Sequence, residues 1–172
     1  TTHVSVLDSK QNAVSITTTN GEGCGYIIPG TGIMMNNMLG EEDLNPLGFH
    51  TWKKSRRLST MISPTIILRN NKPYIVLGSG GSNRLRTAIC QVLINIINKG
   101  FSLKDAIESP RIHLESNNLY IEPEIKINMS ELPSNLIINR FNGKNLFFGG
   151  VNAVMIDSAH ADSRRDGYSL IK

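Results

Sequence analysis

The sequence predicts an α+β fold in which an antiparallel β-sheet is covered on one face by helices. Three observations support this prediction. Two pairs of strand-like segments are each joined by a short polar turn, as in β-hairpins. One long segment repeats apolar residues at helical spacing, and a shorter helical segment follows it. We expect residues 1–172 to form a single domain, because no disordered linker and no internal repeat divides the chain.

The first hairpin is predicted at the start of the chain. Residues 3–8 and 13–19 are rich in Val, Ile and Thr and alternate apolar with polar side chains around the turn "SKQN". A glycine-rich loop, "NGEGCG", follows this hairpin. The apolar residues 33–35 are predicted to form a buried strand, and the polar residues 39–59 a loop.

The second hairpin is predicted at residues 65–68 and 74–77, joined by an Asn-Asn turn. The segment "SGGSNR" then leads into a predicted helix. Apolar residues recur at spacings of three and four from residue 85 to residue 97, and Gly100 is a plausible end of this helix.

The remaining elements are shorter. Ser102 and Asp105 resemble a capping box for a short helix that ends before Pro110. The segments "RIHLE" and "LYIEP" predict a strand pair, and residues 131–138 predict a helix, with Pro133 restricted to its first turn. The segment "FFGGVNAVMID" predicts a final strand, and "SAHADSRRDGYS" a polar tail.

The composition is that of an ordinary globular protein and excludes several classes. Hydrophobic residues make up 40% of the chain, and its apolar runs are far shorter than a membrane span. The net charge is +4 without a basic stripe, so nucleic-acid binding is only weakly indicated. The four histidines are scattered and no metal-ligand spacing occurs, so neither a metal nor another cofactor is predicted. Cys90 falls in the helical pattern as a predicted core residue, and Cys24 in the glycine-rich loop.

Thr1 is a candidate nucleophile. An N-terminal threonine carries a hydroxyl and an α-amine on one residue, so the amine can act as the general base for the hydroxyl. The plain alternative is that removal of a methionine exposes a small residue. Strand alternation places Thr17 and Thr19 on one face of the returning strand, where either could orient the Thr1 amine.

Three further segments could contribute to chemistry. Gly80 and Gly81 could donate N–H groups to an oxyanion, or could simply form a tight turn that needs positive φ. The segment "NNMLGEED" could bind a cation or a substrate ammonium, or could be a solvated loop. Ser59 and Thr60 offer hydroxyls immediately before a predicted strand, where they could also be ordinary strand-start residues.

In this order, the motifs "TTH", "GTGIMMNNM", "STMISPTII", "GSGGSNR" and "SPRIH" make the chain resemble the small subunit of the γ-glutamyltransferases, also called γ-glutamyl transpeptidases. That family consists of N-terminal nucleophile hydrolases. The resemblance covers nearly the whole chain. It implies a four-layer αββα sandwich shared between a large and a small subunit. It also implies a precursor that cuts itself before the nucleophilic threonine.

By position, the resemblance implies that Thr1 is the nucleophile and that Thr19 contacts its amine. Gly80 and Gly81 correspond to the oxyanion-hole glycines. The remaining implied residues would bind substrate: Ser59 and Thr60 the α-carboxylate, Glu41 or else Glu42 the α-ammonium, and Asn20 or Glu22 in place of a family asparagine. The chain departs from the family at Met38, where a glutamine is expected, and its short segment between residues 41 and 57 leaves little room for a lid.

The implied activity is γ-glutamyl hydrolysis or transfer on glutathione and other γ-glutamyl amides through a γ-glutamyl-threonine ester, with water, an amino acid or a peptide as acceptor. Alternatives are a poly-γ-glutamate depolymerase, an amidase similar to cephalosporin acylase, and a non-catalytic relative that binds amino acids. The implied partner is a large subunit from the same precursor, which supplies an arginine for the α-carboxylate. Localisation depends on that unseen chain and is left open.

Overall fold

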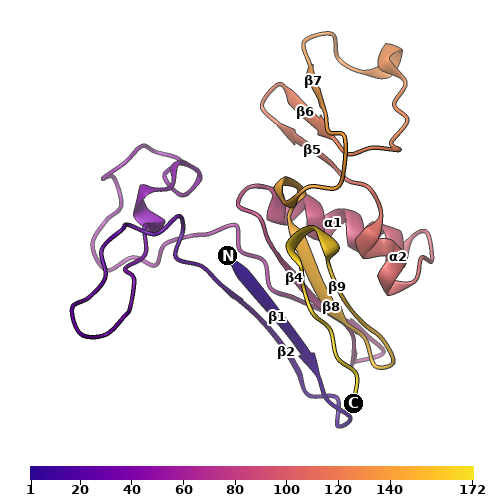
Figure 1. Cartoon of the computed structure of the whole chain (residues 1–172), viewed down its shortest axis with the longest axis horizontal. Coiled ribbons are helices and arrows are strands. Elements are labelled where there is room, and N and C mark those ends of the chain that lie inside the picture. The colour runs from indigo at the N-terminus through magenta and orange to yellow at the C-terminus, as the bar shows by residue number, and fades with distance from the viewer.

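The computed structural model describes residues 1–172 and arranges most of them in three layers (Figure 1). A two-stranded hairpin forms the first layer, a four-stranded sheet the second, and two helices the third. The layered part thus contains two β-layers and one α-layer. A loop-rich lobe and a third, small sheet extend from it on separate sides.

The two sheets of the layered part are antiparallel throughout. In the hairpin, β1 (Thr2–Leu7) pairs with β2 (Ala13–Thr18). The four-stranded sheet has the order β3-β4-β8-β9. Its strands are β3 (Thr65–Arg69), β4 (Lys72–Gly80), β8 (Gly150–Val154) and β9 (Ala159–Ala161). The structure therefore confirms both predicted hairpins, but places them in two stacked sheets instead of one.

Helices α1 (Arg84–Ile97) and α2 (Leu103–Glu108) cover one face of the four-stranded sheet, as the sequence predicts. The apolar stripe of α1 packs with α2 against β4 and β8 and forms the core. Ser102 caps α2 by accepting a hydrogen bond from the Asp105 N–H. The prediction for Cys90 was wrong, because it lies on the exposed side of α1; both cysteines are free.

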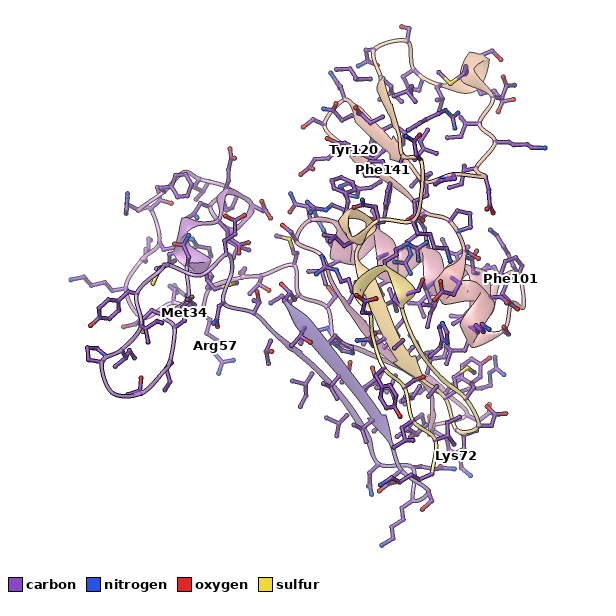
Figure 2. All side chains as sticks on the ribbon, viewed as in Figure 1. Met34, Arg57, Lys72, Phe101, Tyr120 and Phe141 are labelled. Carbon is purple, nitrogen blue, oxygen red and sulfur yellow. The ribbon has the colours of Figure 1, made fainter.

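The third sheet contains β5 (Ile112–Glu115), β6 (Asn118–Ile121) and β7 (Ile137–Arg140). The helix predicted at residues 131–138 was wrong. Only a 3₁₀ turn, Met129–Glu131, forms there, and β7 pairs in parallel with β6. Paired β-branched residues after Pro133 favour this extended conformation. Tyr120 and Phe141 mark the sheet in Figure 2.

The lobe spans residues 20–62 and projects away from the sheets, where Figure 2 labels Met34 and Arg57. It contains two 3₁₀ turns, η1 (Met38–Gly40) and η2 (Glu42–Leu44). The prediction of a buried strand at residues 33–35 was wrong: these side chains are exposed, and a single bridge joins Ile27 to Met34. The apolar run has no sheet of this chain to pack against.

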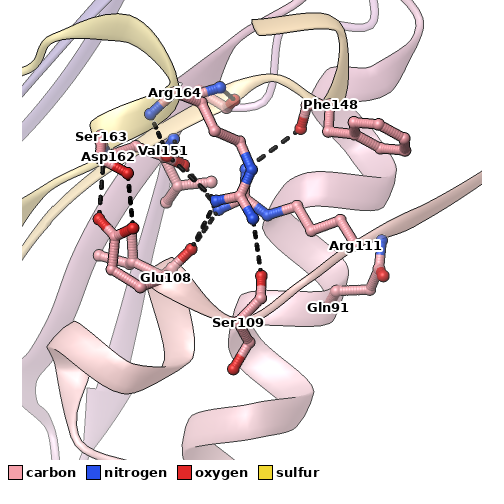
Figure 3. Close-up of polar contacts among 12 residues, drawn as sticks. Gln91, Glu108, Ser109, Arg111, Phe148, Val151, Asp162, Ser163 and Arg164 are labelled. Atoms are coloured by element: carbon pink, nitrogen blue, oxygen red, sulfur yellow. Dashed lines mark hydrogen bonds and ion pairs between the residues drawn. The ribbon is translucent and has the colours of Figure 1, made fainter. Parts of the chain in front are cut away.

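The tail predicted as merely polar contains strand β9 and part of a buried ionic network (Figure 3). Arg111 pairs with Asp162 at 2.6 Å, and Arg164 pairs with both Asp162 and Glu122. Asp162 also accepts the Val151 N–H. The network therefore fixes the start of β8 to the segment that follows β9.

The hairpin layer has an unusual distribution of polarity. Towards the four-stranded sheet it presents polar side chains, and Ser5 and Ser15 donate hydrogen bonds to the carbonyls of Asn152 and Leu77. Its opposite face is apolar and exposed; it consists of Val4, Val6, Val14 and Ile16. We call these four residues the outer hairpin face.

Neither helix of the chain has the length and the apolar composition that a membrane span requires.

We predict that Arg164→Met lowers the free energy of unfolding by about 3–5 kcal/mol, because it leaves the Glu122 carboxylate buried without its cation. Urea denaturation followed by circular dichroism measures this change.

The matched control is Lys144→Met, which removes a partly exposed ion pair with Glu108 and should cost less than about 1 kcal/mol. Equal losses for the two variants would contradict the structural importance of the buried network.

Candidate active site

Thr1 lies at the open end of the hairpin, directly before β1. The register pairs Thr2 with Thr18, so Thr1 and Thr19 face each other one position further along. Their hydroxyl oxygens are 2.9 Å apart, and the Gly21 N–H donates to the Thr19 hydroxyl. The Gly21 N–H therefore orients the Thr19 hydroxyl, which in turn bonds the Thr1 hydroxyl.

His3 fixes the strand that carries Thr1. Its ring is buried against Gly78 of β4, where a Cβ would lie only 2.2 Å from ring atom Cε1. Ser5 donates its proton to the Asn152 carbonyl, so it accepts from His3 Nε2, and Nδ1 accepts from the Thr17 hydroxyl. Thr17 is thus engaged by His3, and of the two threonines only Thr19 bonds Thr1. It bonds the Thr1 hydroxyl, and not the Thr1 amine that the resemblance implies.

Burial lowers the pKa of His3 from 6.5 to about 4, so the ring is neutral at physiological pH. A neutral ring fits its surroundings, because one nitrogen must accept a hydrogen bond while the other donates one.

Gly80 and Gly81 end β4 next to Thr1. A Cβ on Gly80 would lie 2.9 Å from the Thr1 carbonyl oxygen, and one on Gly81 would lie 2.7 Å from Gly149 Cα. Gly81 also has a φ of +136°, which other residues rarely adopt. No backbone hydrogen bond outside the helices and strands uses the Gly81 N–H. The positions thus require glycine, and the Gly81 N–H is left without a backbone partner.

A cavity of about 280 Å³ opens beside Thr1 and has no hydrophobic residue in its lining. Its walls are Thr1, Gly21, Glu22, Asn37, Gly40, Glu41, Glu42, Asp43 and Ser82. Ser82 was missed by the sequence reasoning. Its position directly after Gly81 was the only available signal.

Glu41 is the carboxylate that lines both this cavity and a smaller one next to it. Burial, together with repulsion from Asp43 and Glu22, raises its pKa, whereas the positive charge at the Thr1 amine opposes the rise. Asn45 is buried and donates to the Glu41 and Leu39 carbonyls, which fixes this turn.

The structure brings most, but not all, of the predicted residues to these cavities. Thr60 lines the smaller cavity with Thr1 and Thr19, and Glu22 and Glu42 line the larger one. Ser59 and Asn20 are exposed and line neither, and Gly80 and Gly81 also lie outside both linings. The chain contains no group of three or more His, Cys, Asp or Glu residues arranged to hold a metal ion.

Stacked sheets with a threonine directly before the first strand define the class: the fold is that of the N-terminal nucleophile hydrolases. A γ-glutamyltranspeptidase from Pseudomonas nitroreducens in complex with L-DON has the same fold, with a TM-score of 0.81 at 24% identity and full coverage of both chains.

The sequence model of the γ-glutamyltranspeptidase family matches residues 1–171, so the chain belongs to this family. It is 32% identical over 180 residues to a glutathione hydrolase proenzyme of Bacillus subtilis strain 168, covering 99% of this chain. It is 35% identical over 127 residues, 73% of this chain, to an acylase ACY 1 proenzyme of Pseudomonas sp. strain SE83. The chain spans only 30% and 23% of the length of these two relatives.

We predict that His3 makes the protein less stable as the pH falls from 6.5 to 4. In this range the unfolded chain protonates His3 and the folded chain does not, so falling pH favours unfolding. Urea denaturation at several pH values should show that His3→Asn removes up to about 3 kcal/mol of this pH dependence.

The histidine at position 50 is exposed, so His50→Asn is the matched control and should leave the pH profile as in the wild type. If His3→Asn and the wild type had the same profile, the buried, neutral state of His3 would be refuted.

Proposed function

We propose that the chain is the catalytic small subunit of a γ-glutamyl hydrolase or transferase, formed as one domain over residues 1–172. The observation that supports this best is the placement of Thr1: its hydroxyl is 2.9 Å from Thr19, and its carbonyl lies against Gly80. A nucleophile needs a fixed orientation, a base and a site for the developing oxyanion, and Thr19, the Thr1 amine and the Gly80–Gly81 N–H groups would supply these three components.

In the proposed reaction, Thr1 Oγ1 attacks the γ-carbonyl carbon of a γ-glutamyl amide and gives its proton to the Thr1 amine. The N–H groups of Gly80 and Gly81 stabilise the negative oxygen of the tetrahedral intermediate. The C–N bond then breaks, and the leaving amine takes the proton. The product is a γ-glutamyl ester on Thr1, which water or an acceptor amine resolves by the reverse steps.

The polar cavity supports recognition of an α-amino acid. Glu41 would pair with the α-ammonium, with Glu42 and Glu22 adding negative charge to the same wall. Thr60 would donate its hydroxyl to the α-carboxylate, helped by Ser59. An ammonium bound next to Glu41 would lower the raised pKa of the Glu41 carboxyl towards its ordinary value. Substrate binding therefore favours the ionised form of Glu41.

Glutathione is the proposed donor, because the Bacillus subtilis relative is a glutathione hydrolase proenzyme. An amidase acting on a cephalosporin-type amide is the second candidate, supported by the acylase relative at 35% identity. Poly-γ-glutamate cleavage is a variant of the first proposal. A non-catalytic amino-acid-binding role would apply if the Thr1 hydroxyl proves dispensable.

We predict that Thr1→Ala abolishes release of nitroaniline from γ-glutamyl-4-nitroanilide, because no ester can form, whereas Thr1→Ser retains part of the rate. Absorbance measures turnover, and mass spectrometry of acid-quenched wild type should detect a γ-glutamyl adduct on Thr1. Equal rates for wild type and Thr1→Ala would refute the catalytic proposal and leave the binding role.

The proposed partner is a larger chain from the same precursor, which would add the missing α-layer and continue the hairpin sheet. The outer hairpin face supports this proposal, since each of its four side chains is at least 43% exposed on the hairpin that follows Thr1. A β-sheet face of this composition is normally covered. The exposed apolar residues of the lobe support it in the same way.

We predict that Val4→Glu, introduced into the full-length gene product, lowers the yield of the assembled protein at least ten-fold, because it would bury a charge in the contact. Size-exclusion chromatography measures the yield. Leu114→Glu is the control, because Leu114 is similarly exposed but lies on β5. Equal yields for the two variants would contradict the proposed contact.

A further inference from the structure

Two arginines outside the proposed machinery lie at the end of β4. Arg84 begins α1, directly after the Gly80–Gly81 loop, and Arg165 lies in the 3₁₀ turn after β9. Both are anchored on the turn Leu146–Phe148: Arg84 Nε donates to the Phe147 carbonyl, and Arg165 NH2 donates to the Leu146 carbonyl. Adjacent carbonyls thus bring two guanidinium groups to one side of the site.

Glycines create the space that Arg165 occupies. Its stem crosses Gly150 of β8, where a Cβ would lie 2.5 Å from Arg165 Cδ. Gly150 pairs with Gly80 across the sheet, and a Cβ on Gly80 would lie 3.4 Å from Arg165 NH1 and 2.9 Å from the Thr1 carbonyl oxygen. The guanidinium and the main chain of Thr1 therefore meet over the same glycine.

No carboxylate neutralises the positive charges of Arg84 and Arg165. The neighbouring Arg111 and Arg164 each pair with buried carboxylates, whereas no carboxylate lies within 4.0 Å of a nitrogen of Arg84 or Arg165. Burial and repulsion from Arg84 lower the pKa of Arg165, and the more distant Asp162 only partly offsets this effect. An anion between the two arginines would relieve the repulsion.

We propose that Arg165, supported by Arg84, binds a carboxylate on the part of the substrate beyond the scissile amide, either on the leaving amine or on the acceptor amine that replaces it. The α-amino acid part of the γ-glutamyl group would occupy the acidic cavity on the other side of Thr1, lined by Glu41. A second carboxylate is repelled by that wall and is attracted by the arginines. The preferred substrates are then γ-glutamyl conjugates of amino acids and peptides over those of neutral amines.

This proposal rests on the proposed function, because it assigns the second substrate region of the same site. The alternative is that Arg165 has a purely structural role. A stem packed on Gly150 could stabilise the sheet without contacting substrate, and its loss would then affect all substrates equally.

The test compares two donors that differ mainly in one carboxylate, γ-glutamylglycine and γ-glutamylethylamide, on the full-length gene product. Steady-state kcat/KM is measured for wild type, Arg165→Ala and Arg165→Lys. The matched control is Arg69→Ala, since Arg69 is an exposed arginine on β3 that stacks on Tyr74. Calorimetry then measures binding of both donors to Thr1→Ala and to the Thr1→Ala/Arg165→Ala double variant.

We expect Arg165→Ala to lower kcat/KM for γ-glutamylglycine about ten-fold more than for γ-glutamylethylamide, as for loss of a charge-assisted hydrogen bond. Arg165→Lys should restore part of this preference, and Arg69→Ala should leave it unchanged. In calorimetry, Thr1→Ala should bind γ-glutamylglycine more tightly than γ-glutamylethylamide, and the double variant should lose the difference.

Equal losses for the two donors, or no loss for either, would overturn the proposal. So would the absence of γ-glutamylglycine binding to Thr1→Ala. If wild type turns over neither donor while calorimetry shows an Arg165-dependent preference, the arginine subsite stands and the catalytic function fails.

Discussion

The close contact of the hairpin with the four-stranded sheet is the constraint on which the rest of the structure depends. Gly78 and Gly80 make this contact possible: the first admits the ring of His3, and the second admits the carbonyl of Thr1. With any larger residue at either position, the two sheets would have to separate. Thr1 would then lose its close approach to Gly80.

The opposite edge of the site depends on the ionic network (Figure 3). Asp162 accepts the Val151 N–H and pairs with Arg111, whose own side chain donates to the Phe148 carbonyl. Together these bonds hold the segment that precedes β8, against which Gly81 packs. Buried ion pairs of this kind contribute little net stability but tolerate few alternative geometries, which suits a site that needs fixed positions.

The sequence predicted the elements that have a local signal. Alternation identified both hairpins, spacings of three and four identified α1, and Ser102 correctly marked the start of α2. Strand alternation also placed Thr17 and Thr19 on one face beside Thr1, and the family resemblance selected Thr19. These features depend on neighbours in the chain, so periodicity and turn chemistry contain the necessary information.

Features that depend on distant partners could not be predicted. Asp162 and Arg164 occur in a segment whose composition is that of a solvated tail, and only Arg111 and Glu122, about 40 to 50 residues earlier, make them buried. The sequence around Ile137 is compatible with a helix or a strand, and only its pairing with β6 decides for the strand. Ser82 lines both cavities together with Glu41, although about 40 residues separate the two in the sequence.

The ring of His3 in the space above Gly78 has a consequence for how the hairpin finds its alignment. Most strands are aligned by burying their apolar side chains, but this hairpin directs its valines away from the chain's own core and its serines inwards. A displacement by one residue would turn the valines inwards, so burial within this chain does not select the observed alignment. The imidazole and its matching glycine instead select one position of β1 on β4, and that position is the one that places the main chain of Thr1 against Gly80.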